Sequence, residues 1–170
     1  MRKLLLLGCL LATGTFASAQ LPSFRLDRVI GTPVDFPQDV KVSPAGAVYL
    51  IDRVGLVKLD ATGHHLQTIP LRSATRAPDY RALALDGQRN IFVVNRAQSF
   101  VRKYSAAGDS LTQLGSAGPA PGQFQQPEGI AVDAAGNIYV ADTGNNRLQK
   151  LSASGQVQWV YAPSGTQALV

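Results

Sequence analysis

Short apolar runs recur along the chain, and clusters of Gly, Asp, Asn and Ser separate them. Examples are residues 48–51, 91–94 and 138–141. These runs are rich in Val, Ile, Tyr and Phe, which are the residues most often found in strands. No stretch places apolar residues at the 3.6-residue spacing of an amphipathic helix. The pattern therefore predicts an all-β chain with almost no helix.

One eleven-residue pattern occurs three times without gaps. An apolar residue is followed by a polar turn that contains Gly, then by four strand-forming residues, and finally by Asp or Asn. The copies run over residues 42–52, 85–95 and 132–142. A further apolar run and another Gly follow each copy. A period of roughly 40–50 residues that is filled with strands is typical of propeller blades.

Each period holds four strand-like runs, so the sequence predicts blades of four antiparallel strands. The three blades are expected at about residues 36–71, 79–115 and 126–162. The stretch 116–126 is rich in Gly, Pro and Gln and is expected to connect two blades. An additional outer strand is expected at residues 24–31, just before the first blade.

The third copy resembles an NHL repeat. Its residues 122–133 read GQFQQPEGIAVD and its residues 136–150 read GNIYVADTGNNRLQK. The resemblance extends over roughly residues 36–162, although the first two copies are degenerate. It implies a β-propeller, commonly with six blades, that binds peptide, glycan or RNA on one face. A minority of related propellers are enzymes, so the fold does not settle the function.

Six residues of the third copy match this motif and are expected to have structural roles: Gly129, Asp133, Gly136, Asp142, Asn146 and Arg147. Asp142 and Asn146 are expected to lie in a tight turn, where such side chains bind their own backbone. Arg147 is expected either to pair with Asp142 or to reach the neighbouring blade.

Three blades are fewer than the four to eight of closed propellers. Three interpretations follow. The chain is a truncated propeller, or two chains form a homodimer of six blades, or the three blades remain an open arc. Symmetric closure is common among oligomers, whereas open blades expose apolar surface and strand edges. The sequence leaves the choice open.

The first residues have the features of a secretory signal. A short basic start and an apolar run precede Ala-Ser-Ala at residues 17–19, so cleavage is expected between Ala19 and Gln20. Removal of residues 1–19 would leave a secreted or periplasmic chain of residues 20–170. The alternative is a lipoprotein anchored through Cys9, because Leu-Leu-Gly-Cys at residues 6–9 resembles a lipobox.

Composition excludes several classes of protein. Of 170 residues, 45% are hydrophobic, which is too many for a disordered chain. The formal net charge is +5, but the basic residues are scattered and form no patch that would predict a nucleic-acid partner. A single Cys excludes a disulfide framework. No apolar run approaches the roughly 20 residues of a membrane-spanning helix.

Candidate chemistry is sparse. His64 and His65 are adjacent, so on a strand they point to opposite faces and are expected in an exposed hairpin rather than at a metal. The chain has no G-x-S-x-G, H-E-x-x-H or Walker motif. No catalytic residue, cofactor or metal is therefore predicted.

Arg53 and Arg96 follow equivalent positions of the first two copies, so they are expected at the same rim of adjacent blades. Two arginines at one rim would suit an anionic glycan or a carboxylate. Solvated turn residues are the alternative. The sequence thus predicts an exported, non-enzymatic propeller that binds protein, peptide or glycan. The alternative function is a fragment of a propeller enzyme of the lyase or lactonase type.

Overall fold

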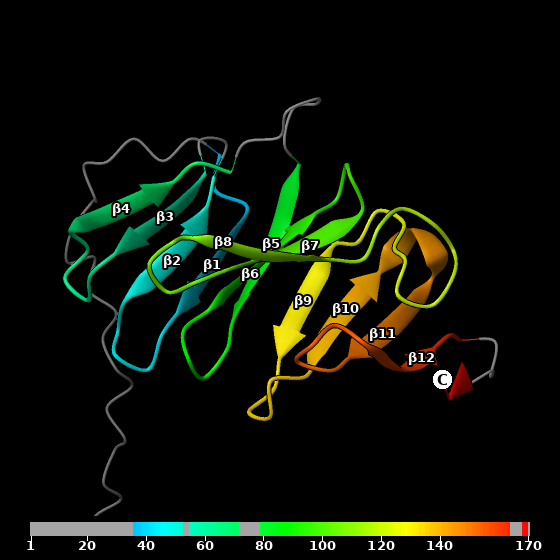
Figure 1. Ribbon diagram of the computed structural model, residues 1–170. Coiled ribbons are helices and arrows are strands. Elements are labelled where there is room, and N and C mark those ends of the chain that lie inside the picture. The colour runs from blue at the N-terminus through cyan, green and yellow to red at the C-terminus, as the bar shows by residue number, and fades with distance from the viewer. Residues whose placement is uncertain (1–35, 53–54, 72–78, 164–167, 170) are drawn as a thin grey trace, which may run out of the picture.

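The computed structural model of the chain describes residues 36–52, 55–71, 79–163 and 168–169. They form three antiparallel sheets in which each strand pairs with the next along the chain (Figure 1). Blade 1 comprises β1 (Asp39–Val42), β2 (Val48–Ile51), β3 (Leu56–Leu59) and β4 (His65–Ile69). Blade 2 comprises β5 (Tyr80–Leu85), β6 (Ile91–Asn95), β7 (Phe100–Tyr104) and β8 (Ser110–Leu114). Blade 3 comprises β9 (Gly129–Val132), β10 (Ile138–Asp142), β11 (Arg147–Leu151), β12 (Val157–Tyr161) and β13 (Ala168–Leu169).

The predicted all-β fold with four-stranded blades is confirmed. The one helical element among the described residues is a single 3₁₀ turn, η1 (Thr143–Asn145), which is far too short to cross a membrane. Blade 3 differs from the prediction because β13 adds a fifth strand beside β12. The expected outer strand at residues 24–31 and the leader at residues 1–19 lie outside the described residues.

The blades pack face to face around their first strands. The first strand of blade 2, β5, lies against both β1 and β9, the first strands of the other two blades. Figure 1 shows the three sheets following one another in an arc, from blue through green to orange. This radial order is that of propeller blades. The described residues form an arc of three blades and no closed ring.

Two apolar layers hold the blades together. One layer, between blades 1 and 2, is built around the fully buried side chains of Ile51, Leu83 and Val93. The other layer, between blades 2 and 3, is built around Phe92 and Val140. Neighbouring residues of a strand point to opposite faces. A blade that is covered on both faces therefore needs the continuous apolar runs seen in the sequence.

Phe124 is the main contribution of the connection at 116–126 to the second layer. Its ring is fully buried between blades 2 and 3. Gly115 allows this close approach, because a Cβ atom there would lie 2.2 Å from the Phe124 ring. The Phe124 N–H also donates to the carbonyl of Ser116 at 2.8 Å. The connection is therefore part of the core.

Replacing Phe124 should weaken the contact between blades 2 and 3. We expect Phe124→Ala to lower the free energy of unfolding by about 3–5 kcal/mol, because it leaves a cavity in a packed layer. Leu111→Ala, at an exposed site on β8, is the matched control and should change it by less than about 0.5 kcal/mol. Urea unfolding of both variants measures the difference. Equal effects would contradict the role given to Phe124.

Candidate functional site

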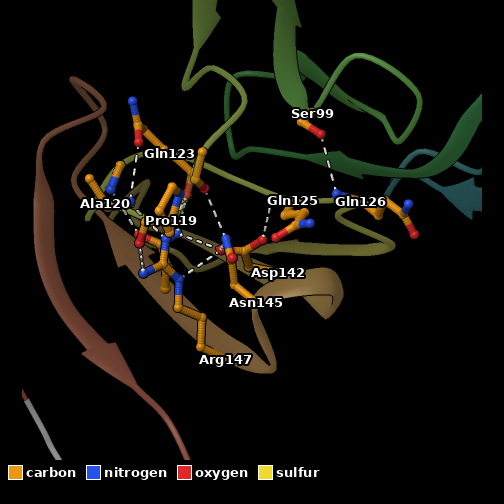
Figure 2. A network of polar contacts seen from close by, with 12 residues as sticks. Ser99, Pro119, Ala120, Gln123, Gln125, Gln126, Asp142, Asn145 and Arg147 are labelled. Carbon is orange, nitrogen blue, oxygen red and sulfur yellow. Dashed lines mark hydrogen bonds and ion pairs between the residues drawn. The ribbon is translucent and has the colours of Figure 1, made fainter.

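Asp142 is the centre of a polar network at the end of β10 (Figure 2). Its carboxylate is fully buried. The Oδ2 atom accepts hydrogen bonds from Arg147 Nε at 2.7 Å and from Asn145 Nδ2 at 2.8 Å. The Oδ1 atom accepts one from the backbone N–H of Gln125 at 2.6 Å. A buried carboxylate needs such partners, since an unpaired buried charge is strongly destabilising.

The Arg147 guanidinium fixes the connection that precedes blade 3. Its Nη1 atom donates to the carbonyl of Pro119 at 2.6 Å, and its Nη2 atom donates to the carbonyls of Ala120 and Gln123, both at 2.8 Å. Arg147 thus pairs with Asp142, as one of the two expectations proposed, and binds the connection with its remaining nitrogens. Figure 2 shows these contacts converging on one loop. The network therefore has a structural role, and we refer to Asp142, Arg147 and the side chains that bind the connection with them as the clasp.

Asp142 contacts its own turn through the Asn145 side chain, whereas its Oδ1 atom binds the connection and not a backbone N–H of the turn. In the other blades the equivalent side chains do bind their own turns. Asp52 Oδ1 accepts from the N–H of Gly55, and Asn95 Oδ1 accepts from the N–H of Gln98, both at 2.9 Å. In blade 3 the connection passes beside the turn, so its Gln125 N–H takes that place.

Asn146 closes the 3₁₀ turn η1. It adopts a left-handed conformation with a φ of 50°, and its N–H donates to the carbonyl of Thr143 at 3.0 Å. Asn tolerates this conformation better than most residues. Asn146 therefore lies in the tight turn, where its backbone N–H makes the contact expected of its side chain.

Gln149 is a member of the clasp that the sequence reasoning missed. Its side chain is fully buried and donates to the Gln123 carbonyl at 2.6 Å and to Asp142 Oδ2 at 3.0 Å. Its Oε1 atom accepts from the N–H of Gly122 at 2.9 Å. A sequence signal for this role was available. Gln149 is polar, but it pairs in register with Val140 and so lies on the same buried face of the sheet.

Asp133 and Gly136 build the turn between β9 and β10. Asp133 Oδ1 accepts from the N–H groups of Ala135 and Asn137 at 3.0 and 2.8 Å. The Asn137 side chain is the main cause of a lowered pKa for the Asp133 carboxyl. Gly136 has a φ of 83°, which favours Gly. Gly129 lies close to Ala141, whose Cβ would be 3.3 Å from a Cβ added there.

A second polar network follows the rim at which the first strand of each blade begins. Arg81 of blade 2 donates to Gln38 of blade 1 at 3.1 Å and pairs with Asp79 at 2.7 Å. Asp79 pairs in turn with Arg96 at 3.2 Å, and Arg96 pairs with Glu128 of blade 3 at 3.1 Å. We refer to these five residues as the rim network. It joins all three blades at one edge.

Arg96 lies at this rim, and its charge is balanced. Its Nε atom is buried and forms an ion pair with the Glu128 carboxylate, but the angle between the two groups does not allow a hydrogen bond. Its Nη1 atom donates to Asp79 at 3.2 Å and its Nη2 atom to Gln126 at 3.3 Å. Arg53 lies outside the described residues, so the pairing of the two arginines on one ligand stays a prediction.

The two histidines lie in the hairpin between β3 and β4 and have separate partners. His64 Nδ1 is 2.7 Å from Thr62 Oγ1, and His65 Nε2 is 2.8 Å from Thr68 Oγ1. Among the residues that the structure describes, no three His, Cys, Asp or Glu side chains gather as metal ligands would. Ala19, Gln20 and Cys9 lie outside those residues.

Comparison with known sequences identifies the repeat. Residues 124–151 match the family model of the NHL repeat. The chain is 38% identical over 74 residues to NHL repeat-containing protein 3 of Homo sapiens, and this match covers 39% of this chain and 21% of that protein. It is 38% identical over 53 residues to Protein brain tumor of Drosophila melanogaster, covering 31% of this chain and 5% of that protein. The chain thus spans 21% and 5% of the length of these two relatives.

Comparison with solved structures identifies the fold. A streptogramin B lyase structure has a TM-score of 0.61 at 21% identity, covering 78% of this chain and 42% of that chain. The WD40 repeats of RRP9 have a TM-score of 0.65 at 13% identity, covering 82% and 42%. At these identities the likeness shows the fold alone. The resemblance of the third copy to an NHL repeat and the propeller-type blades are thereby confirmed.

Removing Arg147 should open the clasp. We expect Arg147→Ala to lower the free energy of unfolding by about 3–5 kcal/mol, because it leaves the buried Asp142 carboxylate without its cation. Lys41→Ala, which breaks the exposed ion pair with Asp39, is the control and should cost less than about 1 kcal/mol. Chemical denaturation of both variants tests this.

A double variant separates the charge from the loop contacts. If the uncompensated carboxylate dominates, Asp142→Asn should recover part of the stability that Arg147→Ala loses. If the double variant is as unstable as the sum of the two single variants, the two side chains act independently and the clasp described above is wrong.

Proposed function

We propose that this chain is an interaction module that binds a polypeptide partner at the rim network and has no catalytic role. The observation that carries the proposal is the rim itself, where side chains of three blades meet at one edge. Propeller folds place such edges where loops of several blades converge, so a partner contacts several blades at once. The NHL-repeat and propeller likenesses supply the scaffold.

Comparison of the three blades separates scaffold positions from rim positions. A Lys over an aromatic ring recurs at one place in every blade, as Lys58 over Tyr49, Lys103 over Phe92 and Lys150 over Tyr139. The rim changes instead, because Gln38, Arg81 and Glu128 occupy one position of the repeat. Positions that repeat serve packing. Positions that change from blade to blade are free to serve recognition.

The charge of the rim favours a polypeptide over a polyanion. Arg81 and Arg96 are balanced by Asp79 and Glu128 within 3.2 Å. A polyanion would have to displace these carboxylates, whereas a polypeptide can offer both charges and polar backbone groups. Electrostatic complementarity of this kind gives specificity more than raw affinity.

The enzyme alternative has no support in the site. The likeness to the streptogramin B lyase, at 21% identity, shows the fold alone. Two acids of the described residues are buried, Asp52, which accepts from the N–H of Gly55, and Asp142. Asp142 is paired with Arg147 and shielded from solvent. It is therefore unsuited to act as a general base on a substrate.

Substitutions at the rim test the binding proposal. Peptide and glycan arrays would first find ligands of the purified chain. We expect peptide hits whose affinity falls about tenfold for Arg96→Gln and for Arg53→Gln, since each loses a charge-assisted hydrogen bond. Arg89→Asn is the control for charge, because Arg89 lies in the β5–β6 turn at the opposite edge and has a φ of 64° that Asn tolerates.

The result can contradict the proposal in two ways. Hits confined to anionic glycans would assign the rim to a different ligand class. Peptide hits that bind both rim variants as tightly as the unchanged chain would place recognition elsewhere. Calorimetry on the best hit measures the affinities, and circular dichroism checks that the variants keep their strands.

The same proposal includes export. The basic start, the apolar run and Ala-Ser-Ala at residues 17–19 support a cleavable signal that ends at Ala19. In a bacterial host with the general secretion pathway, the intact mass of the recovered protein should correspond to a chain that begins at Gln20. Ala19→Arg should block cleavage, because this position requires a small residue. A lipid-bearing product that begins at Cys9 would contradict this cleavage site.

A further inference from the structure

The outer face of blade 3, opposite blade 2, carries an apolar pocket of about 400 Å³. Its apolar lining comes from Ala141, Leu148, Tyr161 and Pro163, and we refer to these four residues as the blade-3 end. Tyr161 is 51% exposed, which is unusual for an aromatic side chain on a sheet face. Among the described residues, no further sheet covers this face.

The repeat register shows what this pocket corresponds to. Three residues of the blade-3 end have counterparts in both other blades, and all of those counterparts are buried against the following blade: Ile51, Leu56 and Ile69 in blade 1, and Val94, Val101 and Leu114 in blade 2. In the layer beyond blade 2 the buried ring of Phe124 packs with these side chains. The pocket is thus the same surface without its partner blade.

The opposite end of the arc, in blade 1, also exposes apolar side chains that are covered in the other blades. Val40 and Val42 of β1 are 55% and 62% exposed. Their counterparts in blade 3, Ile130 and Val132, pack on the layer shared with blade 2. We refer to Val40 and Val42 with the β3–β4 turn at residues 60–63 as the blade-1 end. Between the two valines and this turn, on the same face of blade 1, the side chains of Leu50, Val57 and Leu59 are buried.

We infer that a second copy of this chain docks its blade-1 end on the blade-3 end, so that two copies form one ring of six blades. The two ends differ, so the contact is head to tail, and such a contact closes into a ring when the rotation allows it. Six blades lie within the four to eight of closed propellers. The inference uses the faces of the outer blades and does not depend on the rim network.

Three contacts between neighbouring blades of the arc indicate how the copies meet. Lys58 of blade 1 donates to the Ala106 carbonyl in the β7–β8 turn of blade 2 at 3.4 Å. A Cβ on Gly108 of the same turn would lie 2.7 Å from Ile69, and one on Gly155 would lie 2.6 Å from Leu114.

Lys150 and Tyr161 are the blade-3 counterparts of Lys58 and Ile69. If the second copy docks as blade 2 docks on blade 1, its turn at residues 60–63 therefore lies against Lys150 and Tyr161. Lys150 already lies over the Tyr139 ring at 5.4 Å, as Lys58 lies over Tyr49 in blade 1. Its ammonium group is therefore positioned to donate to the carbonyl of Ala61 in that turn. Tyr161 would meet Gly63, which has no side chain and whose φ of 84° favours Gly at this position.

Light scattering of the purified full chain tests the inference. We expect twice the mass of one chain over a wide range of concentrations. Tyr161→Asp and Val40→Asp should each weaken the dimer at least about tenfold, because each buries an unpaired charge in the contact. Leu111→Asp is the matched control, since Leu111 is 53% exposed on β8 away from both ends, and it should remain dimeric.

A mixture of the two end variants identifies the geometry. Tyr161→Asp keeps an intact blade-1 end and Val40→Asp keeps an intact blade-3 end, so mixing them should restore association through one intact contact. A Tyr161→Ser variant and circular dichroism guard against a loss that is due to unfolding. A monomeric unchanged chain would overturn the inference. So would a Val40→Asp variant that stays dimeric while Tyr161→Asp does not, because that pattern indicates contact between two blade-3 ends.

Discussion

The face-to-face packing of sheets is the constraint on which the rest of this structure depends. Each blade has only four or five short strands and cannot bury its apolar side chains alone, so stability comes from the layers between blades. Blade 2 has a neighbour on both faces, and every residue of its β6 is buried. In the outer blades, by contrast, Val42 and Tyr161 are exposed.

Blade 3 adds a polar device to this apolar design. The connection at residues 116–126 inserts Phe124 between two blades, and the clasp of Asp142, Arg147 and Gln149 fixes its backbone. The clasp satisfies backbone carbonyls that an apolar core could not serve. In the third copy, Asp142 and Arg147 of the motif thus hold the connection at residues 116–126 in place.

The proposed function and the fold rest on different parts of the same repeat. The strands and the lysine–aromatic pairs recur from blade to blade, whereas the rim carries Gln38, Arg81 and Glu128 at one equivalent position. A surface built from changing residues on a constant scaffold suits recognition of a partner more than chemistry on a substrate. The outer blade faces add a second surface, apolar and separate from the rim, on which the proposed assembly of two copies would depend.

The strands, the turns and the number of blades could be predicted from the amino-acid pattern, because period-two patterning and turn residues act over a few neighbours. The same pattern offered two alternatives for Arg147, and the structure selects the pairing with Asp142. Only the tertiary structure revealed that Gln149 is buried, that Asp142 binds the Gln125 backbone, and that Arg96 is balanced by Asp79 and Glu128. The contacts of Asp142 with Gln125 and of Arg96 with Asp79 and Glu128 join residues 17 to 32 positions apart, which local patterns do not encode. They depend on how one blade and its connection pack against the next.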